Sequence, residues 1–350
     1  MDQHVRICRW AKLPLVLALC TTISGCYYVQ AAAGQWQVLR KSEPIGDVLD
    51  ENDTPDELSE RLRLVQAARR FSIDELGLPD NKSYRSYTDI EREFVVWNVF
   101  AAPEFSLHAR QWCFPVAGCV SYRGYFSRDA AYREAERLAD KGYDVAVGGV
   151  SAYSTLGKFN DPVLSSMLQW DDIQLVGTLF HELAHQLLYV KGDSGFNESF
   201  ATAVEEFGLE RWLVANGRPD DIDTYRQRRQ LRGDLMALVA AARDDLRVHF
   251  EAPTDDAQKR KLKAARLEQL RTDITAHLAL SGRANTDWLS GELNNARLAS
   301  MTLYEGWLPS FRSLLEACDG DIRCFYSRAR DLSALDNLER NARLGELARR

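Results

Sequence analysis

One apolar run, residues 173–190, constrains this 350-residue chain more than any other feature. Its hydrophobic residues continue around all sides of a helix, which is typical of a buried helix, yet it carries His181, Glu182 and His185. Residues four apart share a helix face, so both imidazoles could hold one metal ion, most often zinc. Glu182 is offset by about 100° and could reach a water on that ion. Because an ionised glutamate is rarely buried without a partner, a metal is favoured over two core histidines and a satisfied glutamate.

The composition is that of a soluble globular protein, with 45% hydrophobic and 27% charged residues. The net charge is −7 and no basic stripe is present, so nucleic-acid binding is not expected. The hydrophobic patterns predict an α+β fold that is mainly helical. A small β-sheet is expected to pack against the His181 helix, and the C-terminal half is expected to be helical. We predict a signal peptide over 1–25 and a single domain over 26–350, with an α+β part to about 217 and a helical part from about 218.

Local patterns predict the elements that flank the central helix. A β-branched and aromatic run predicts a strand over 94–100, and an apolar run predicts another over 143–150. Between them, Ser127 opens an amphipathic helix that ends at Gly142. A second helix is expected over 197–216, after a glycine-rich turn.

The first 25 residues read as a targeting segment rather than as part of the fold. A basic start precedes a short apolar run over 13–19, which is too short to span a bilayer. Ile23-Ser24-Gly25 before Cys26 resembles the lipobox of bacterial lipoproteins, which implies cleavage before Cys26 and lipid on its sulfur. Tyr27 in place of aspartate then implies the outer membrane, facing the periplasm of the bacterial cell envelope. The alternative is an ordinary secretory signal followed by a chance cysteine.

The number and spacing of the cysteines are consistent with an exported protein. Of the seven, two lie in the predicted signal peptide and one is the predicted lipid site. An oxidising compartment favours disulfides between the remaining four, which form two pairs with six-residue spacing. A second metal site is the rival interpretation, but nearby histidines and a C-x-x-C pattern are missing. The predicted disulfides are Cys113–Cys119 and Cys318–Cys324.

A catalytic zinc ion needs a third protein ligand and an open position. Three glutamates follow the motif, namely Glu198, Glu205 and Glu206. The first two lie two helical turns apart, roughly 10 Å along the axis, so only one of them can touch the ion. We predict Glu198 as the ligand, because it adjoins the turn that folds the second helix back. Glu205 is expected either to hold a ligand histidine from behind or to be a solvated surface acid.

Two segments together resemble the gluzincin peptidases. His181 to Gln186 reads HELAHQ and 197–201 reads NESFA, where the aminopeptidase branch carries HELAHQ and NEGFA. The resemblance implies a zincin-type fold, one Zn²⁺ ion and a peptide substrate. It also implies Glu182 as general base and His181, His185 and Glu198 as metal ligands. The connecting turn is six residues shorter than in that branch, and Glu205 matches the thermolysin-like spacing, so the ligand choice stays open.

A closer resemblance covers most of the mature chain. Residues 112–119, 122–126 and 294–298, together with HELAHQ, are similar to a family of predicted zinc aminopeptidases found as bacterial lipoproteins. This family implies an aminopeptidase that is attached to the membrane through lipid at Cys26. The alternatives are a zinc endopeptidase of the envelope and a non-catalytic lipoprotein that keeps a zinc ion. Nothing in the sequence indicates an oligomeric state.

The same resemblance implies a substrate strand and an oxyanion donor. Gly148, Gly149, Val150 and Ser151 lie where a gluzincin edge strand pairs with the substrate, and glycines permit close approach. The strand lacks the glutamate that binds the substrate amine in aminopeptidases, and a plain strand-end turn is the alternative. For the oxyanion donor the candidate is Tyr304, with Tyr225 as runner-up.

Overall fold

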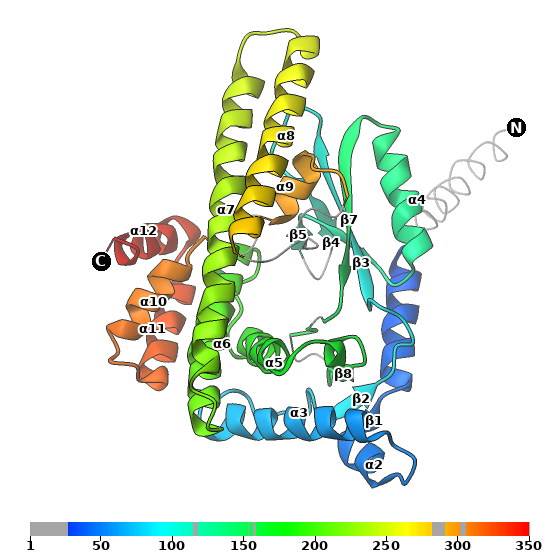
Figure 1. Cartoon of the computed structure of the whole chain (residues 1–350), viewed down its shortest axis with the longest axis vertical. Coiled ribbons are helices and arrows are strands. Elements are labelled where there is room, and N and C mark those ends of the chain that lie inside the picture. The colour runs from blue at the N-terminus through cyan, green and yellow to red at the C-terminus, as the bar shows by residue number, and fades with distance from the viewer. Residues whose placement is uncertain are drawn as a thin grey trace, which may run out of the picture.

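The computed structural model describes residues 27–114, 118–152, 154–156, 159–281, 291–301 and 306–349. Within these residues the fold is α+β and mainly helical, as predicted (Figure 1). Residues 27–40 form an N-terminal helix. The further helices are α2 (Ile45–Asp50), α3 (Asp56–Asp74), α4 (Arg128–Ala139), η1 (Met167–Gln169), α5 (Asp172–Leu187), α6 (Ser194–Ala215), α7 (Asp221–Glu251), α8 (Asp256–Leu280), α9 (Asn295–Met301), α10 (Leu308–Glu316), α11 (Ile322–Ala334) and α12 (Asn337–Leu347). The strands are β1 (Glu43–Pro44), β2 (Ser86–Thr88), β3 (Val96–Pro103), β4 (Trp112–Phe114), β5 (Gly118–Val120), β6 (Arg123–Tyr125), β7 (Tyr143–Val150) and β8 (Val163–Leu164).

The main sheet has the order β6-β3-β7, and both neighbours run antiparallel to β3. Alternate residues of β3 face opposite sides of this sheet. Val99 and Ala101 pack with residues of α4, whereas Phe100 and Ala102 pack with Ala296 of α9. The sheet therefore lies between two helices, and β6 and β7 are its two edge strands among the described residues. Two smaller sheets, β1-β2-β8 and β4-β5, complete the β structure.

α5 and α6 form an antiparallel pair in the middle of the largest hydrophobic core. Asp171 caps α5 by accepting a hydrogen bond from the Gln174 backbone N–H. The second helix was predicted over 197–216 but begins at Ser194, because the Asp193 side chain caps it by accepting from the Phe196 N–H. Gly208 lets the two helices approach closely, since a Cβ there would lie 3.0 Å from the Phe180 ring.

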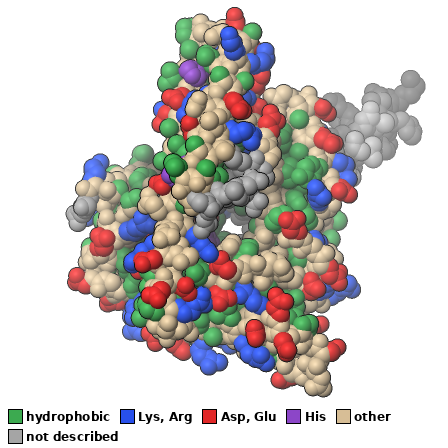
Figure 2. Space-filling view, viewed as in Figure 1, with side chains coloured by type: hydrophobic (Ala, Val, Ile, Leu, Met, Phe, Trp, Pro, Cys, Tyr) green, Lys and Arg blue, Asp and Glu red, His purple; other side chains and the backbone are tan. Residues whose placement is uncertain are grey.

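The C-terminal helices pack in two places. α7 and α8 form a long hairpin with a hydrophobic core of its own, whereas α10, α11 and α12 add to the main core beside α6. Both predicted disulfides are present: Cys113–Cys119 joins β4 to β5, and Cys318–Cys324 joins the segment after α10 to α11. On the face shown in Figure 2, acidic and basic side chains are interspersed. The division of the chain near residue 217 stays a prediction.

None of the helices in the described ranges is long and apolar enough to cross a membrane. The predicted signal peptide and Cys26 lie outside these ranges, as does Tyr304.

Candidate metal centre

One turn of α5 and the start of α6 bring three side chains to a common point. His181 and His185 project from the same face of α5, and their Nε2 atoms lie 3.1 Å apart. Glu198 of α6 faces both rings, with 3.3 Å from its Oε2 to His181 Nε2 and 3.6 Å from its Oε1 to His185 Nε2. The turn between the helices is fixed by Asn197, whose side chain accepts from the N–H and donates to the C=O of Val190.

These distances fit a tetrahedral ion. Ligand atoms about 2.0–2.1 Å from a tetrahedral zinc lie roughly 3.3 Å from one another. The two Nε2 atoms lie 3.1 Å apart, and each has one oxygen of Glu198 at 3.3 Å (Oε2) or 3.6 Å (Oε1), so all three distances are close to that value. The donor set of two imidazoles and one carboxylate is also the set found in catalytic zinc sites. Among the described residues, His181, His185 and Glu198 can therefore hold a metal ion.

Glu205 lies behind the first histidine. Its Oε2 is 3.1 Å from His181 Nδ1, the ring nitrogen that points away from Glu198. The Tyr225 hydroxyl donates to the other oxygen of Glu205 at 3.5 Å. Tyr225, the runner-up as oxyanion donor, is thus directed at Glu205. The neighbouring Glu206 turns elsewhere and pairs with Arg229 and Arg312.

The two glutamates control the charge of His181. Burial alone would lower the pKa of His181, but hydrogen bonds with Glu198 and Glu205 raise the pKa to about 10. Burial alone would raise the pKa of Glu198, but its bonds with His181 and His185 lower the pKa to about 2. The pKa of Glu205 is lowered for the same reason, against the effect of its burial. In the metal-free centre, the extra proton on His181 therefore supplies the positive charge that a metal ion would otherwise bring.

Glu182 lies on the adjacent face of α5. Burial raises its pKa, whereas both histidines of the site act to lower it. The carboxylates of Glu198 and Asp161 add to the rise. A raised pKa lies closer to neutral pH, and a general base is most effective when its pKa is near the pH at which it works.

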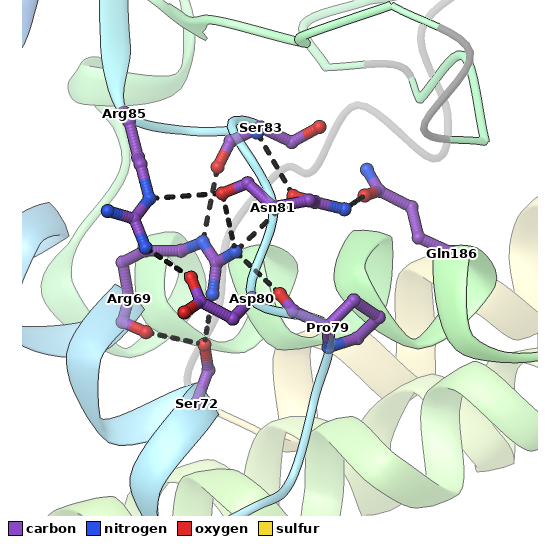
Figure 3. A network of polar contacts seen from close by, with 8 residues as sticks. All are labelled: Arg69, Ser72, Pro79, Asp80, Asn81, Ser83, Arg85 and Gln186. Atoms are coloured by element: carbon purple, nitrogen blue, oxygen red, sulfur yellow. Dashed lines mark hydrogen bonds and ion pairs between the residues drawn. The ribbon is translucent and has the colours of Figure 1, made fainter.

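Gln186 connects the end of α5 to two loops. Its side-chain nitrogen faces Asp161 Oδ2 at 3.4 Å, and its oxygen accepts from Asn81 Nδ2 at 2.7 Å. Asn81 in turn belongs to a loop fastened by the buried Arg69, which donates to carbonyl oxygens including that of Asn81 (Figure 3). Gln186, the sixth residue of HELAHQ, therefore connects α5 to the loops that contain Asn81 and Asp161.

Two tyrosines near the centre were not predicted from the sequence. Tyr122, between β5 and β6, packs on Phe100 and is half-buried. Burial raises its pKa to about 12, and the carboxylates of Glu198 and Glu182 act in the same direction. Tyr189 follows α5, and its ring centroid lies 6.5 Å from that of His185. Tyr189 lies beyond the end of the helix, so helical spacing alone could not have placed it there.

The predicted substrate strand corresponds to the end of β7 and the residue after it. The two glycines differ in surroundings. A Cβ on Gly149 would lie 2.3 Å from the Phe94 ring, whereas one on Gly148 would meet only Phe100 at 4.0 Å. The Asn294 side chain donates to the Val145 carbonyl near the other end of the strand. The Phe94 ring thus packs directly on Gly149, whereas the space in front of Gly148 is open.

Comparison with known proteins gives one family. No curated protein and no solved structure matches the chain. The model of the family described as "Putative aminopeptidase" matches residues 26–344, which is most of the sequence. Its description agrees with a peptidase function, and its match includes every residue of the metal centre. The chain therefore belongs to this aminopeptidase family.

Proposed function

We propose that the chain is a zinc-dependent peptidase that removes residues from the N-terminus of peptides. The observation that carries this proposal is the arrangement of His181, His185 and Glu198, whose ligand atoms have the spacing of a three-ligand zinc site. A carboxylate with a raised pKa, Glu182, lies on the same turn of helix. A purely structural zinc site would close its fourth position and would need no such base.

The residues divide the chemistry between them. A bound zinc ion would polarise the scissile carbonyl and lower the pKa of a water molecule towards about 7. Glu182 takes the proton of the attacking water and passes it to the leaving amine. Glu205 holds His181 through Nδ1, which keeps Nε2 directed at the ion. The edge of β7 binds the extended peptide by backbone hydrogen bonds.

A zinc endopeptidase is the second candidate, because β7 carries no glutamate that could bind the substrate amine. Peptides with free and with acetylated N-termini distinguish the two. An aminopeptidase cleaves only the free peptides, from the end inward. Internal cleavage of the acetylated peptides would establish the endopeptidase instead.

The proposed base is tested by Glu182→Gln. This variant keeps all three proposed ligands, so its zinc content by elemental analysis should equal that of the parent. Its kcat should fall by about 10²–10⁴-fold, the usual contribution of a general base. Full turnover by a zinc-loaded Glu182→Gln protein would rule out the mechanism.

We further propose that the protein is exported and attached to the bacterial outer membrane through lipid on Cys26. The lipobox resemblance supports this proposal, and the two disulfides agree with an oxidising compartment. Mass spectrometry of the mature N-terminus tests it. Acyl chains on Cys26 are expected, and an unmodified N-terminus would contradict the anchor.

A further inference from the structure

The N-terminal helix turns an apolar face outward. Val29 and Trp36 are 68% and 67% exposed, and Tyr28 is 45% exposed. Ala32 and Ala33 lie between them and are also exposed. Spacings of three and four residues place Val29, Ala33 and Trp36 along one side of a helix. Single exposed apolar residues are ordinary on soluble proteins, but here they form a continuous stripe.

The inward face of this helix is fastened to the rest of the molecule. The Gln30 side chain donates to the Gly124 carbonyl and accepts from the Phe126 N–H. A Cβ on Gly34 would lie 2.1 Å from the Phe126 ring, so the helix backbone packs directly on that ring. Val38 is 2% exposed. Because these contacts set the rotation of the helix, the apolar stripe cannot turn inward.

The position of the stripe in the chain indicates what covers it. In the sequence, Cys26, the proposed lipid site, immediately precedes the first described residue, and the segment before it is basic and apolar. Trp36 lies nine residues beyond Tyr27, roughly 14 Å along a helix with a rise of 1.5 Å per residue. Tryptophan favours the membrane interface, because its apolar ring can contact lipid there while its N–H remains hydrated. Arg40 follows on the same exposed side and suits an anionic headgroup.

We propose that the apolar stripe (Val29, Ala32, Ala33 and Trp36) lies flat in the interfacial layer of a phospholipid bilayer. This inference rests on the proposed lipid anchor at Cys26 and goes beyond it. The acyl chains attach the protein, and the stripe adds a second contact that fixes its orientation on the membrane. A single anchor would leave the protein free to rotate about its tether, whereas two contacts hold the side of the molecule that carries the N-terminal helix towards the lipid.

A fluorophore on an introduced cysteine tests the contact. Cleavage of the signal peptide removes two cysteines, and in the lipid-modified protein the others are lipidated or paired, so Ala33→Cys provides one free thiol. The full chain is expressed with its signal, purified, labelled and reconstituted in phosphatidylethanolamine–phosphatidylglycerol vesicles that carry nitroxide on their acyl chains. The Ala33→Cys label should lose roughly half or more of its fluorescence, because an interfacial helix lies about 5–10 Å deep. Adding Trp36→Gln should restore most of it.

Val248→Cys is the matched control, since Val248 is 63% exposed near the far end of α7. Its label should not be quenched, and the unmutated chain gives the labelling background. Equal fluorescence at both positions would overturn the proposal. Mass spectrometry of Cys26 in the same sample distinguishes the proposed lipid anchor from the proposed interfacial helix. Lipid on Cys26 without quenching leaves the anchor and removes the interfacial helix. If Cys26 carries no lipid, the labelling is repeated with Cys26→Ser so that position 33 again holds the only label, and quenching there keeps the interfacial helix and removes the anchor. Peptidase activity is measured independently of both.

Discussion

His181 is held at both of its ring nitrogens, and the whole centre depends on this. Nε2 faces Glu198, and Nδ1 faces Glu205. Since a neutral imidazole has one donor and one acceptor nitrogen, Glu205 fixes the proton on Nδ1 and leaves Nε2 free to bind a metal. His185 has no such support, because its Nδ1 is buried without a hydrogen-bond partner among the described residues.

Glu205→Gln should therefore weaken metal binding without removing a ligand. The loss of a carboxylate behind a ligand histidine costs about 10–100-fold in metal affinity. Competition with a fluorescent chelator measures it. Glu206→Gln is the control, because Glu206 pairs with arginines and has no contact with the centre. Equal losses in both variants would show that Glu205 does not act through His181.

Tyr122→Phe tests a hydroxyl that could stabilise the transition state. The carboxylates of both Glu198 and Glu182 raise the pKa of Tyr122, so this phenol lies within electrostatic range of the metal centre. We expect kcat to fall about 10²-fold, the cost of removing one oxyanion donor, with KM nearly unchanged. Tyr189→Phe, the same change on the more exposed neighbour, should have a smaller effect. If Tyr122→Phe turns over normally, the donor lies elsewhere, and Tyr304 becomes the next residue to change.

At this scale, helical spacing was sufficient to predict that His181 and His185 lie together, and Glu198 faces both rings in the structure. The sequence did not predict what surrounds these three side chains. Tyr122 lies about sixty residues earlier on a different element. Its electrostatic interaction with Glu198 depends on the tertiary arrangement of these elements, which no local pattern contains.

At the scale of elements, Arg69 is unusual because it is 3% exposed and has carbonyl oxygens rather than a carboxylate as partners. Burial lowers its pKa to about 10. Its planar guanidinium fastens the loop that contains Asn81, which in turn bonds Gln186 of α5 (Figure 3). Helix α3 thus supports the helix of the metal centre through one side chain.

Arg69→Lys keeps the charge but cannot reach these acceptors in the same geometry. Several buried carbonyls would lose their donor, so we expect the free energy of unfolding to fall by about 2–3 kcal/mol. Denaturant titration measures the change. Arg85→Lys is the control, since Arg85 bonds the same loop from a half-exposed position and should cost about 0.5 kcal/mol or less. Similar midpoints for both variants would show that the buried network is unimportant.

The elements themselves were predictable where the signals are local. The strand over 143–150 coincides with β7, and the Ser127-capped helix corresponds to α4. The strand predicted over 94–100 begins later, at Val96, because the Arg92 side chain binds the carbonyls of Phe94 and Val95. Strand order could not be predicted, since β2 pairs with β8 although 74 residues, 89–162, lie between them in the chain, and that pairing depends on the packed core.

At the scale of the whole molecule, metal binding is coupled to protons. The pKa of His181 is about 10 in the metal-free protein, above its ordinary value of 6.5, so the ring is charged at pH 7. This charge contributes stability that is fully present below pH 6.5 and is lost as the pH rises through about 10. A metal must displace this proton, and zinc affinity should therefore increase as the pH rises towards 10.

Calorimetric titration of the metal-free protein with zinc tests this coupling. At pH 7 about one proton should be released per ion bound, as measured in buffers of different ionisation enthalpy. Zinc at about 100 times its Kd should add about 2.7 kcal/mol to the stability, and a chelator should reverse the rise in Tm. Binding without proton release would show that His181 is neutral in the metal-free state.

Gly208 has only a hydrogen atom as its side chain, and this affects the spacing of the helices that carry the metal centre. A methyl group there would meet the side chains of both Leu76 and Phe180, and the latter adjoins His181 in sequence. The separation between the two central helices is thus set at a residue that no ion touches. The same two helices carry the imidazoles and the carboxylate opposite. A bulkier residue at Gly208 would force α6 away from α5 and Leu76, so it would disturb the metal centre without changing any of the three proposed ligands.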